Sequence, residues 1–303
     1  MTPSSGSPLV GSPLAPVALT FVSAIMWGLW WMPIRWIESM GLSGAQAGII
    51  CNLGAALAIG AYMIVARVHL RLSARTILGA ALVGVAFASY SVAFTLSDVV
   101  RVILLFYLAP AWSKIIEWAF LGRRWRATST LTLSLSLGGA YLVMGGDISL
   151  AAINLGDALA LLSGVSWAIG AALVFTGRKS TTSALTLATV IWAMLLSLAF
   201  AWITGEAMPT PSNAPALLAS LALGAVYLVP VLGVTLWSAQ RLPPGLLSFL
   251  FTLEIVAGVV SGAIFLDEPF GLYRLSGGLL IIAAALIEAI AALRAPPAPK
   301  ATA

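Results

Sequence analysis

The residues that could carry chemistry in this sequence are charged and aromatic side chains inside otherwise apolar stretches. One apolar stretch long enough to cross a membrane contains Lys114 and Glu117, with Arg101 near its start, and a later one contains Glu254. A charged side chain costs at least about 2.5 kcal/mol at the centre of a bilayer, so such groups usually face a protein interior or a water-filled path. The two stretches therefore indicate a path through a membrane rather than lipid anchors.

Each of these charged residues has a structural and a functional interpretation. Lys114 and Glu117 are three residues apart and can pair on one helix face; we favour a neutralised pair over a Lys114 that attracts a substrate carboxylate. Glu254 is a candidate proton carrier for coupling or a structural acid that accepts hydrogen bonds, and the second role is slightly favoured. Arg101 is a candidate partner of Asp98 or the guard of an exit.

Aromatic side chains at helical spacing suggest a substrate cavity. Tyr90 and Phe94 share one helix face, and ligand sites are mostly apolar and aromatic, although core packing explains such positions equally well. The candidate cavity residues are Trp27, Tyr90, Phe94, Tyr107, Lys114, Trp167, Tyr227 and Trp237. Tryptophans near segment ends are expected in the interfacial aromatic belt instead, namely Trp31, Trp36, Trp125 and Trp202.

Prolines inside apolar segments are candidate bend points. A proline removes one helical hydrogen bond and can kink the helix, although membrane helices also tolerate it passively. The candidate hinge or gate residues are therefore Pro33, Pro110 and Pro230, together with Arg101.

Composition identifies the class of protein. Of 303 residues, 61% are hydrophobic and only 8% are charged, whereas a soluble domain is about 25% charged. This composition predicts a polytopic membrane protein. The net charge of +5 does not indicate nucleic-acid binding, because the basic residues form short clusters between apolar runs, a pattern that orients membrane helices.

The supply of reactive side chains is small. Cys51 and His69 are each the only residue of their type, so no disulfide within the chain, cysteine-based metal site or histidine-based catalytic set is expected. We therefore predict no catalytic residues, no metal and no cofactor, and neither an enzyme nor a scaffold. The first 13 residues lack Lys and Arg, so the first apolar segment is expected to stay in the protein as a helix rather than serve as a signal peptide.

A bilayer core requires about 20 apolar residues per helix, and the chain contains ten such segments. They cover residues 16–37, 45–66, 75–96, 99–121, 127–145, 155–176, 184–204, 214–238, 244–266 and 272–293. The predicted division is a disordered tail over 1–13, a first five-helix repeat over 14–146, a second over 150–293 and a C-terminal tail over 294–303.

The distribution of basic residues predicts the orientation. With the N-terminus in the cytoplasm, eleven of the 15 Lys and Arg residues fall in cytoplasmic segments and only Arg35, Arg101 and Arg274 fall outside. Most acidic residues show the opposite bias. Because cytoplasmic loops carry an excess of Lys and Arg, both termini are expected in the cytoplasm.

Short internal similarities indicate a duplicated unit. SAIMWG at residues 23–28 aligns with SGVSWA at 163–168, which matches Trp27 to Trp167. AFLGRRW at 119–125 aligns with IFLDEPF at 264–270 in the same order. A repeat of five helices must insert upside down relative to its copy, and inverted repeats around a central site are typical of transporters.

The ends of the fourth and ninth segments carry a family resemblance. YLAP followed by AFLG, and TLEI followed by FLDEP, resemble the ten-helix, two-repeat transporters of the drug/metabolite transporter superfamily, and most closely bacterial aromatic amino acid exporters. The resemblance implies export of small metabolites through a cavity between the repeats. The chain departs from the family at Arg123 and Arg124, which replace the acidic residue often found there, whereas Glu268 fills the matching position of the second repeat.

The sequence thus predicts an all-α integral membrane protein, with ten transmembrane helices in two inverted five-helix repeats around a central cavity. The predicted function is export of aromatic and other neutral amino acids by alternating access across a bacterial inner membrane. The alternative is a permease for another solute, such as a cationic drug or another metabolite. The expected partners are a small-molecule substrate and the lipid bilayer, without nucleic acid, in a monomer or weak homodimer. Proton antiport and facilitated diffusion both stay open.

Overall fold

The structure is a computed structural model that describes residues 14–120, 125, 127–143, 145, 153–178, 180–206, 213–239, 244–266 and 271–294. Most of these residues are helical and none lies in a strand, which confirms the all-α prediction for them. The two predicted tails lie outside the described residues, apart from Arg294 at the end of the last helix.

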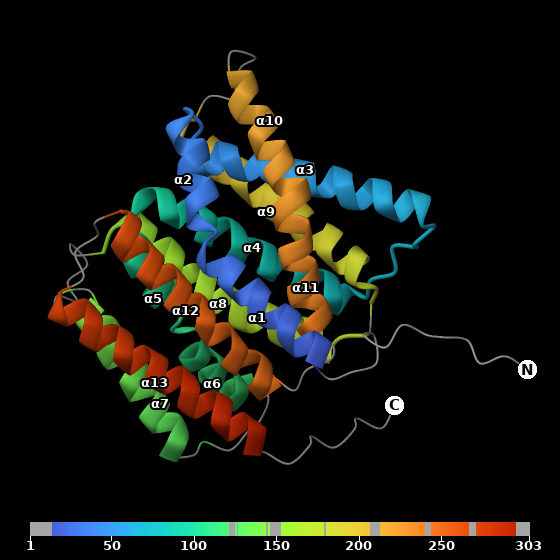
Figure 1. Ribbon diagram of the computed structural model, residues 1–303. Coiled ribbons are helices and arrows are strands. Elements are labelled where there is room, and N and C mark those ends of the chain that lie inside the picture. Colours follow the sequence, from blue (N-terminus) through green and yellow to red (C-terminus); the bar gives the residue numbers. More distant parts are fainter. Residues whose placement is uncertain are drawn as a thin grey trace, which may run out of the picture.

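Each of the ten apolar segments corresponds to one helix or to consecutive helices in Figure 1. In chain order these are α1 Leu14–Gly28, α2 Trp31–Ser39, α3 Gly44–Val65, α4 Ala74–Leu96, α5 Val99–Phe106, α6 Ala109–Phe120, α7 Ala127–Val143, α8 Leu155–Thr176, α9 Thr182–Ile203, α10 Ala214–Leu223, η3 Gly224–Leu228, α11 Val229–Ala239, α12 Pro244–Phe265 and α13 Leu272–Arg294.

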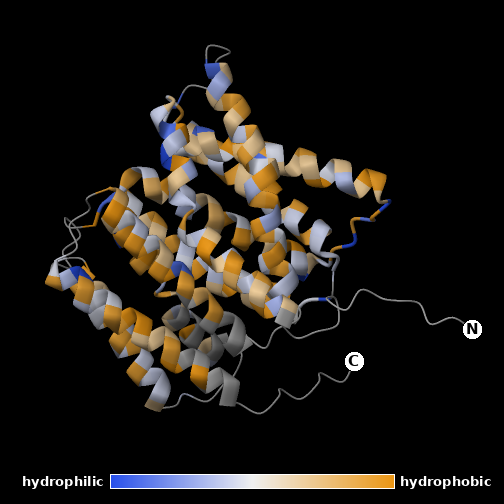
Figure 2. Ribbon diagram, viewed as in Figure 1, coloured by the Kyte–Doolittle hydropathy of each residue, from blue (hydrophilic) through white to orange (hydrophobic). Residues whose placement is uncertain are grey.

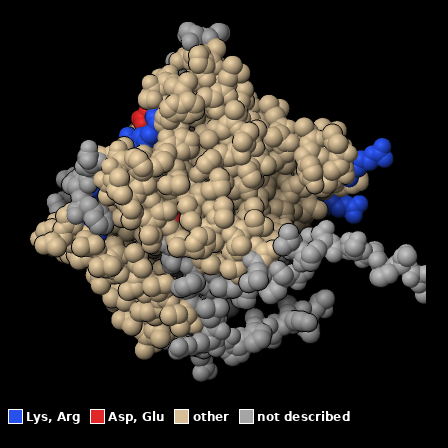
Figure 3. All heavy atoms as spheres, in the orientation of Figure 1, with Lys and Arg blue, Asp and Glu red and all other residues tan. Residues whose placement is uncertain are grey.

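Six stretches of the described chain are long and apolar enough to cross a membrane. They are Ala15–Ser39, Gly44–Val65, Ala74–Leu96, Leu155–Val174, Thr182–Ile203 and Ala214–Ser238. The full arrangement of ten spans in two inverted repeats stays a prediction. Figure 2 shows hydrophobic residues along the helices, and Figure 3 shows charged atoms in only a few places on the visible face. Both features agree with a protein embedded in a membrane.

Three apolar segments are interrupted just before a proline. Pro33 has no N–H to bond the carbonyl of Leu29, and α1 gives way to α2 at that point. Pro110 has the same relation to Phe106, the last residue of α5. Pro230 follows the π-helical turn η3. Such a local change of helix type lets a membrane helix accommodate the hydrogen bond that a proline cannot make. The regular helix is therefore interrupted near each of these prolines, while their role as bend points or hinges stays a prediction.

The two halves of the chain pack against each other along several helices. In Figure 1, α4 lies against α8 and α9, α3 against α9, α1 against α12, and α7 against α13. The core that results is built from both halves and not from two separate cores.

The crossing of α7 and α13 depends on two facing glycines. A Cβ on Gly139 would lie 2.7 Å from the carbonyl oxygen of Gly277, and a Cβ on Gly277 would lie 2.6 Å from that of Gly139. Both distances are too short for an ordinary contact, so the backbones approach as closely as small residues allow.

We expect the substitution Gly139→Ala to destabilise the protein by about 1–3 kcal/mol, because the added methyl group overpacks this crossing. The matched control is Gly138→Ala on the same helix, where an added Cβ meets nothing within 4 Å and should raise helix stability by up to about 1 kcal/mol. Thermal unfolding of both variants in detergent measures the difference. Equal melting temperatures would contradict the close approach.

Exposure of the tryptophans tests the predicted aromatic belt. Trp202 is 82% exposed, and Trp36 and Trp125 are also exposed, as expected for residues that face lipid at an interface. The prediction for Trp31 was wrong, because this residue is only 3% exposed. Trp31 follows the break between α1 and α2 inside a span that continues to Ser39, so its ring points into the core.

Candidate substrate site

Aromatic side chains gather where the interrupted helices meet. Trp30 lies at the break between α1 and α2, Tyr107 lies between α5 and α6, and Tyr227 lies in η3. A helix interruption changes the direction of the following side chains and frees backbone groups, and membrane proteins tolerate such backbone only where protein or water surrounds it. Trp30 and Tyr227 belong to one group of packed rings, and Tyr107 belongs to a second.

The first aromatic group consists of Trp27, Trp30, Phe87 and Tyr227. Neighbouring ring centroids in this group are 5.4–6.2 Å apart, in tilted or edge-to-face arrangements that favour ring contact. Phe87 comes from α4, so this group joins three helices from both halves of the chain.

The indole N–H and phenol O–H groups of the first aromatic group all donate hydrogen bonds to neighbouring residues. The indole N–H of Trp27 donates to Thr235 Oγ1 at 2.8 Å, and that of Trp30 donates to Ser91 Oγ at 2.9 Å. The Tyr227 hydroxyl donates to the Met26 carbonyl at 2.5 Å, just before the break in the first span. These bonds orient the rings.

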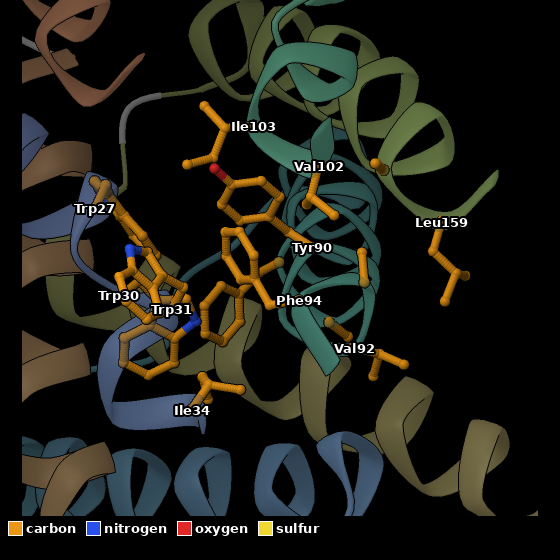
Figure 4. Packing of buried hydrophobic residues seen from close by; sticks show 14 of the residues in the cluster. Trp27, Trp30, Trp31, Ile34, Tyr90, Val92, Phe94, Val102, Ile103 and Leu159 are labelled. Carbon is orange, nitrogen blue, oxygen red and sulfur yellow. The ribbon is translucent and has the colours of Figure 1, made fainter. Parts of the chain in front are cut away.

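The second aromatic group consists of Tyr90, Phe94, Phe106 and Tyr107, with centroids 4.5–5.3 Å apart along the chain of rings. Tyr90 and Phe94 share one face of α4, as their spacing predicts. In Figure 4, these two residues lie opposite Trp27, Trp30 and Trp31. The two groups thus occupy neighbouring parts of the same core.

The carboxylate of Glu254 lies beside the second group. Glu254 of α12 is only 5% exposed and accepts hydrogen bonds from Tyr90 Oη at 3.1 Å and Tyr107 Oη at 2.8 Å. The Tyr107 oxygen also lies 2.6 Å from the Phe251 carbonyl. Because a phenol has one proton, Tyr107 can donate fully to only one of these two acceptors. The two hydroxyl donors favour a structural role for Glu254.

The structure brings together most of the predicted cavity residues but not all of them. Trp27, Tyr90, Phe94, Tyr107 and Tyr227 contribute to the buried core. Trp167 on α8 and Trp237 on α11 are half-buried and lie outside this core. The side chains of Lys114, Glu117 and Pro110 lie outside what the structure describes.

Sequence reasoning missed three aromatic members of the site, Trp30, Phe87 and Phe106. Phe87 lies three residues before Tyr90 on α4, so the helical spacing that identified Tyr90 and Phe94 could have included it. Trp30 lies three residues after Trp27, so the same spacing could have included it. Phe106 is the last residue of α5, next to an interruption, and carried no such signal.

Of the two interpretations of Arg101, the pairing with Asp98 was wrong, and the guard of an exit stays a prediction. Arg101 lies 2.6 Å from Asp157 of α8, and Asp98 pairs with Arg274 of α13. Each carboxylate pairs with an arginine from the other half of the chain, because the starts of α5, α8 and α13 lie close together.

The comparison with protein families concerns the half of the chain that supplies Tyr227 and Glu254. Residues 154–288 match the EamA-like transporter family. This EamA-like part runs from the start of α8 into α13, and the match supports the resemblance to the drug/metabolite transporter superfamily. It also supports a membrane transporter rather than an enzyme, in agreement with the long apolar helices.

The fold extends this similarity beyond the EamA-like part. One solved crystal structure covers 92% of this chain, and this chain covers 99% of that structure, with a TM-score of 0.60 at 17% sequence identity. At this identity the likeness shows a shared fold and nothing of the substrate. No curated protein sequence matches the chain significantly.

Proposed function

We propose that this protein exports aromatic and other neutral amino acids by alternating access. The observation that carries the proposal is the pair of aromatic groups at the points where three spans are interrupted. The second half of the chain contributes Tyr227 to the first group and Glu254 beside the second. Edge-to-face and offset contacts with a substrate ring add about 0.5–1.5 kcal/mol each beyond area burial. Such a modest gain suits a transporter, which must also release its substrate.

The architecture that we propose is ten spans in two inverted five-helix repeats, as a monomer or weak homodimer. Two packing contacts support it, because α3 lies against α9 and α7 lies against α13, and these are the second and fifth segments of each predicted repeat. The proposed location is a bacterial inner membrane with both termini in the cytoplasm, supported by the excess of Lys and Arg in the cytoplasmic segments.

A permease for a cationic solute is the second candidate. Aromatic faces attract cations, and the Glu254 carboxylate accepts hydrogen bonds from Tyr90 and Tyr107 of the second aromatic group. The two candidates differ in the charge of the transported molecule and can be separated directly.

The test is uptake of labelled phenylalanine, tyrosine, tryptophan, threonine and lysine into liposomes that contain the purified protein. We expect saturable uptake of the aromatic amino acids, absent from empty liposomes, and little uptake of lysine. Uptake of a cationic dye in place of the amino acids would favour the second candidate. Absence of amino acid uptake by folded protein would contradict the first.

A further inference from the structure

Charged groups divide the described part of the molecule into two unlike ends. Glu38, Asp98, Asp157 and Glu206 lie at the ends of α2, α4, α8 and α9, which we call the acidic end. The described turns at the opposite end, between α3 and α4 and between α8 and α9, carry arginines without acids. In Figure 3, positive and negative atoms occur together at the upper left, whereas positive atoms alone occur at the right.

The acidic end is held together by polar contacts that cross from one half of the chain to the other. Arg101 of the first half lies 2.6 Å from Asp157 of the second, and Arg274 of the second half pairs with Asp98 of the first. The Ser43 hydroxyl also donates to Glu206. Each contact therefore joins the first half of the chain to the second.

Asp157 is the centre of this network. Its side chain is fully buried, accepts a hydrogen bond from Ser97 Oγ at 2.9 Å, and accepts another from the backbone N–H of Asn154 at 3.1 Å. Asn154 Nδ2 lies 3.2 Å from Ser97 Oγ. The turn between α4 and α5 is thus bonded to the start of α8 by several groups at once.

Arg35 lies at the same end but joins two parts of the first half, because it donates to the Ser97 carbonyl at 3.2 Å. Arg35 of α2 and Arg274 of α13 therefore both reach the turn that contains Ser97 and Asp98, while Arg101 of α5 reaches Asp157. Among the described residues, no ion pair joins the two halves at the opposite end.

We propose that this network is a latch that keeps the acidic end closed and must open during transport. The network consists of Arg101–Asp157, Arg274–Asp98 and Ser97–Asn154. A contact made in only one of two conformations biases the equilibrium toward it, so loss of the latch shifts the protein toward the state that is open at the acidic end. The inference rests on the proposed function for the meaning of opening, but its first test needs no substrate.

The first test measures thiol exposure beneath the latch. The reporter is Ala160→Cys, a fully buried position one turn after Asp157, in a Cys51→Ala background that removes the native cysteine. Asp98→Arg would place a fourth positive charge among the three arginines. The labelling rate follows the fraction of molecules that are open at the acidic end. We expect a tenfold larger open fraction, so a water-soluble maleimide should label this variant about tenfold faster than the parent.

A charge swap and a matched control make the test specific to the latch. The double variant Asp98→Arg/Arg274→Asp restores opposite charges and should return labelling toward the parent rate. Glu38→Gln removes an ion pair at the same end, 3.5 Å from Arg35 on the same helix, and should leave labelling unchanged. Unchanged labelling in Asp98→Arg, with a normal thermal transition, would overturn the latch.

A second test keeps the native charges and applies if Asp98→Arg does not fold. A short thiol-reactive cross-linker joins cysteines introduced by Ser97→Cys and Asn154→Cys, again without Cys51. Cross-linking should stop transport, and cleavage of the linker should restore it. Undiminished transport by the cross-linked protein would overturn the latch. If no substrate is transported at all, the proposed function fails while the labelling test still decides the latch.

Discussion

Replacement of Asp157 by alanine is expected to lower the free energy of unfolding by about 3–5 kcal/mol, the usual cost of removing one partner of a buried ion pair. The substitution takes the carboxylate away from the partly buried Arg101 guanidinium. It also deletes half of the capping box that Asn154 and Asp157 form at the start of α8, and loss of a cap typically costs about 0.5–2 kcal/mol.

Thermal unfolding in detergent measures this loss, with two comparison variants. Asp157→Asn keeps one acceptor oxygen and should lose less stability than Asp157→Ala. Glu38→Gln removes a partly exposed pair, and such pairs contribute about 0–1 kcal/mol. If Asp157→Ala were no less stable than Glu38→Gln, the burial and pairing of Asp157 would be incorrect.

Replacement of Glu254 by leucine is expected to have the second-largest effect. It removes the acceptor of the Tyr90 hydroxyl, whereas Tyr107 keeps the Phe251 carbonyl. An unsatisfied buried hydroxyl costs about 1–3 kcal/mol, so Glu254→Leu should destabilise the protein mainly through Tyr90.

A double-mutant cycle isolates this contribution. Tyr90→Phe should cost about 1 kcal/mol in the native protein and should recover part of the lost stability in the Glu254→Leu variant. Tyr107→Phe should recover less there, because the Tyr107 hydroxyl still has an acceptor. Simple additivity of Tyr90→Phe and Glu254→Leu would contradict the hydrogen bond.

The substitution Glu254→Gln distinguishes a structural role of Glu254 from a role as proton carrier. With a structural role, Glu254→Gln slows transport but leaves its response to an imposed proton gradient unchanged. A variant that still exchanges labelled for unlabelled substrate but no longer responds to the gradient would assign proton transfer to Glu254. Glu38→Gln, which removes a partly exposed pair within α2, serves as the control.

Local features of this fold could be predicted from the sequence because their causes are local. The prolines at 33, 110 and 230 each lack an N–H, and each is preceded by an interruption. Apolar runs of about 20 residues predicted the long helices for a similarly direct reason, since a bilayer core has a known thickness. The helical spacing of Tyr90 and Phe94 placed them on one face of α4 before any contact was known.

Contacts between distant segments could not be predicted in this way. Trp31 was expected at the membrane interface, yet the break before it turns its ring toward Ser261 of α12, whose hydroxyl lies 3.0 Å from the indole nitrogen. Glu254 gave no indication of Tyr90 and Tyr107 as its partners, because 164 and 147 residues separate them along the chain.

The sequence by itself thus determined the class of protein, the long apolar helices, the points where they are interrupted and the excess of acids at one end. Only the tertiary structure decided which rings pack together and which arginine pairs with which carboxylate. Arg101 shows the physical reason. Asp98 is its neighbour in sequence, but the packing of α5 against α8 puts the buried Asp157 within 2.6 Å, and a buried charge requires a close partner more than an exposed one does.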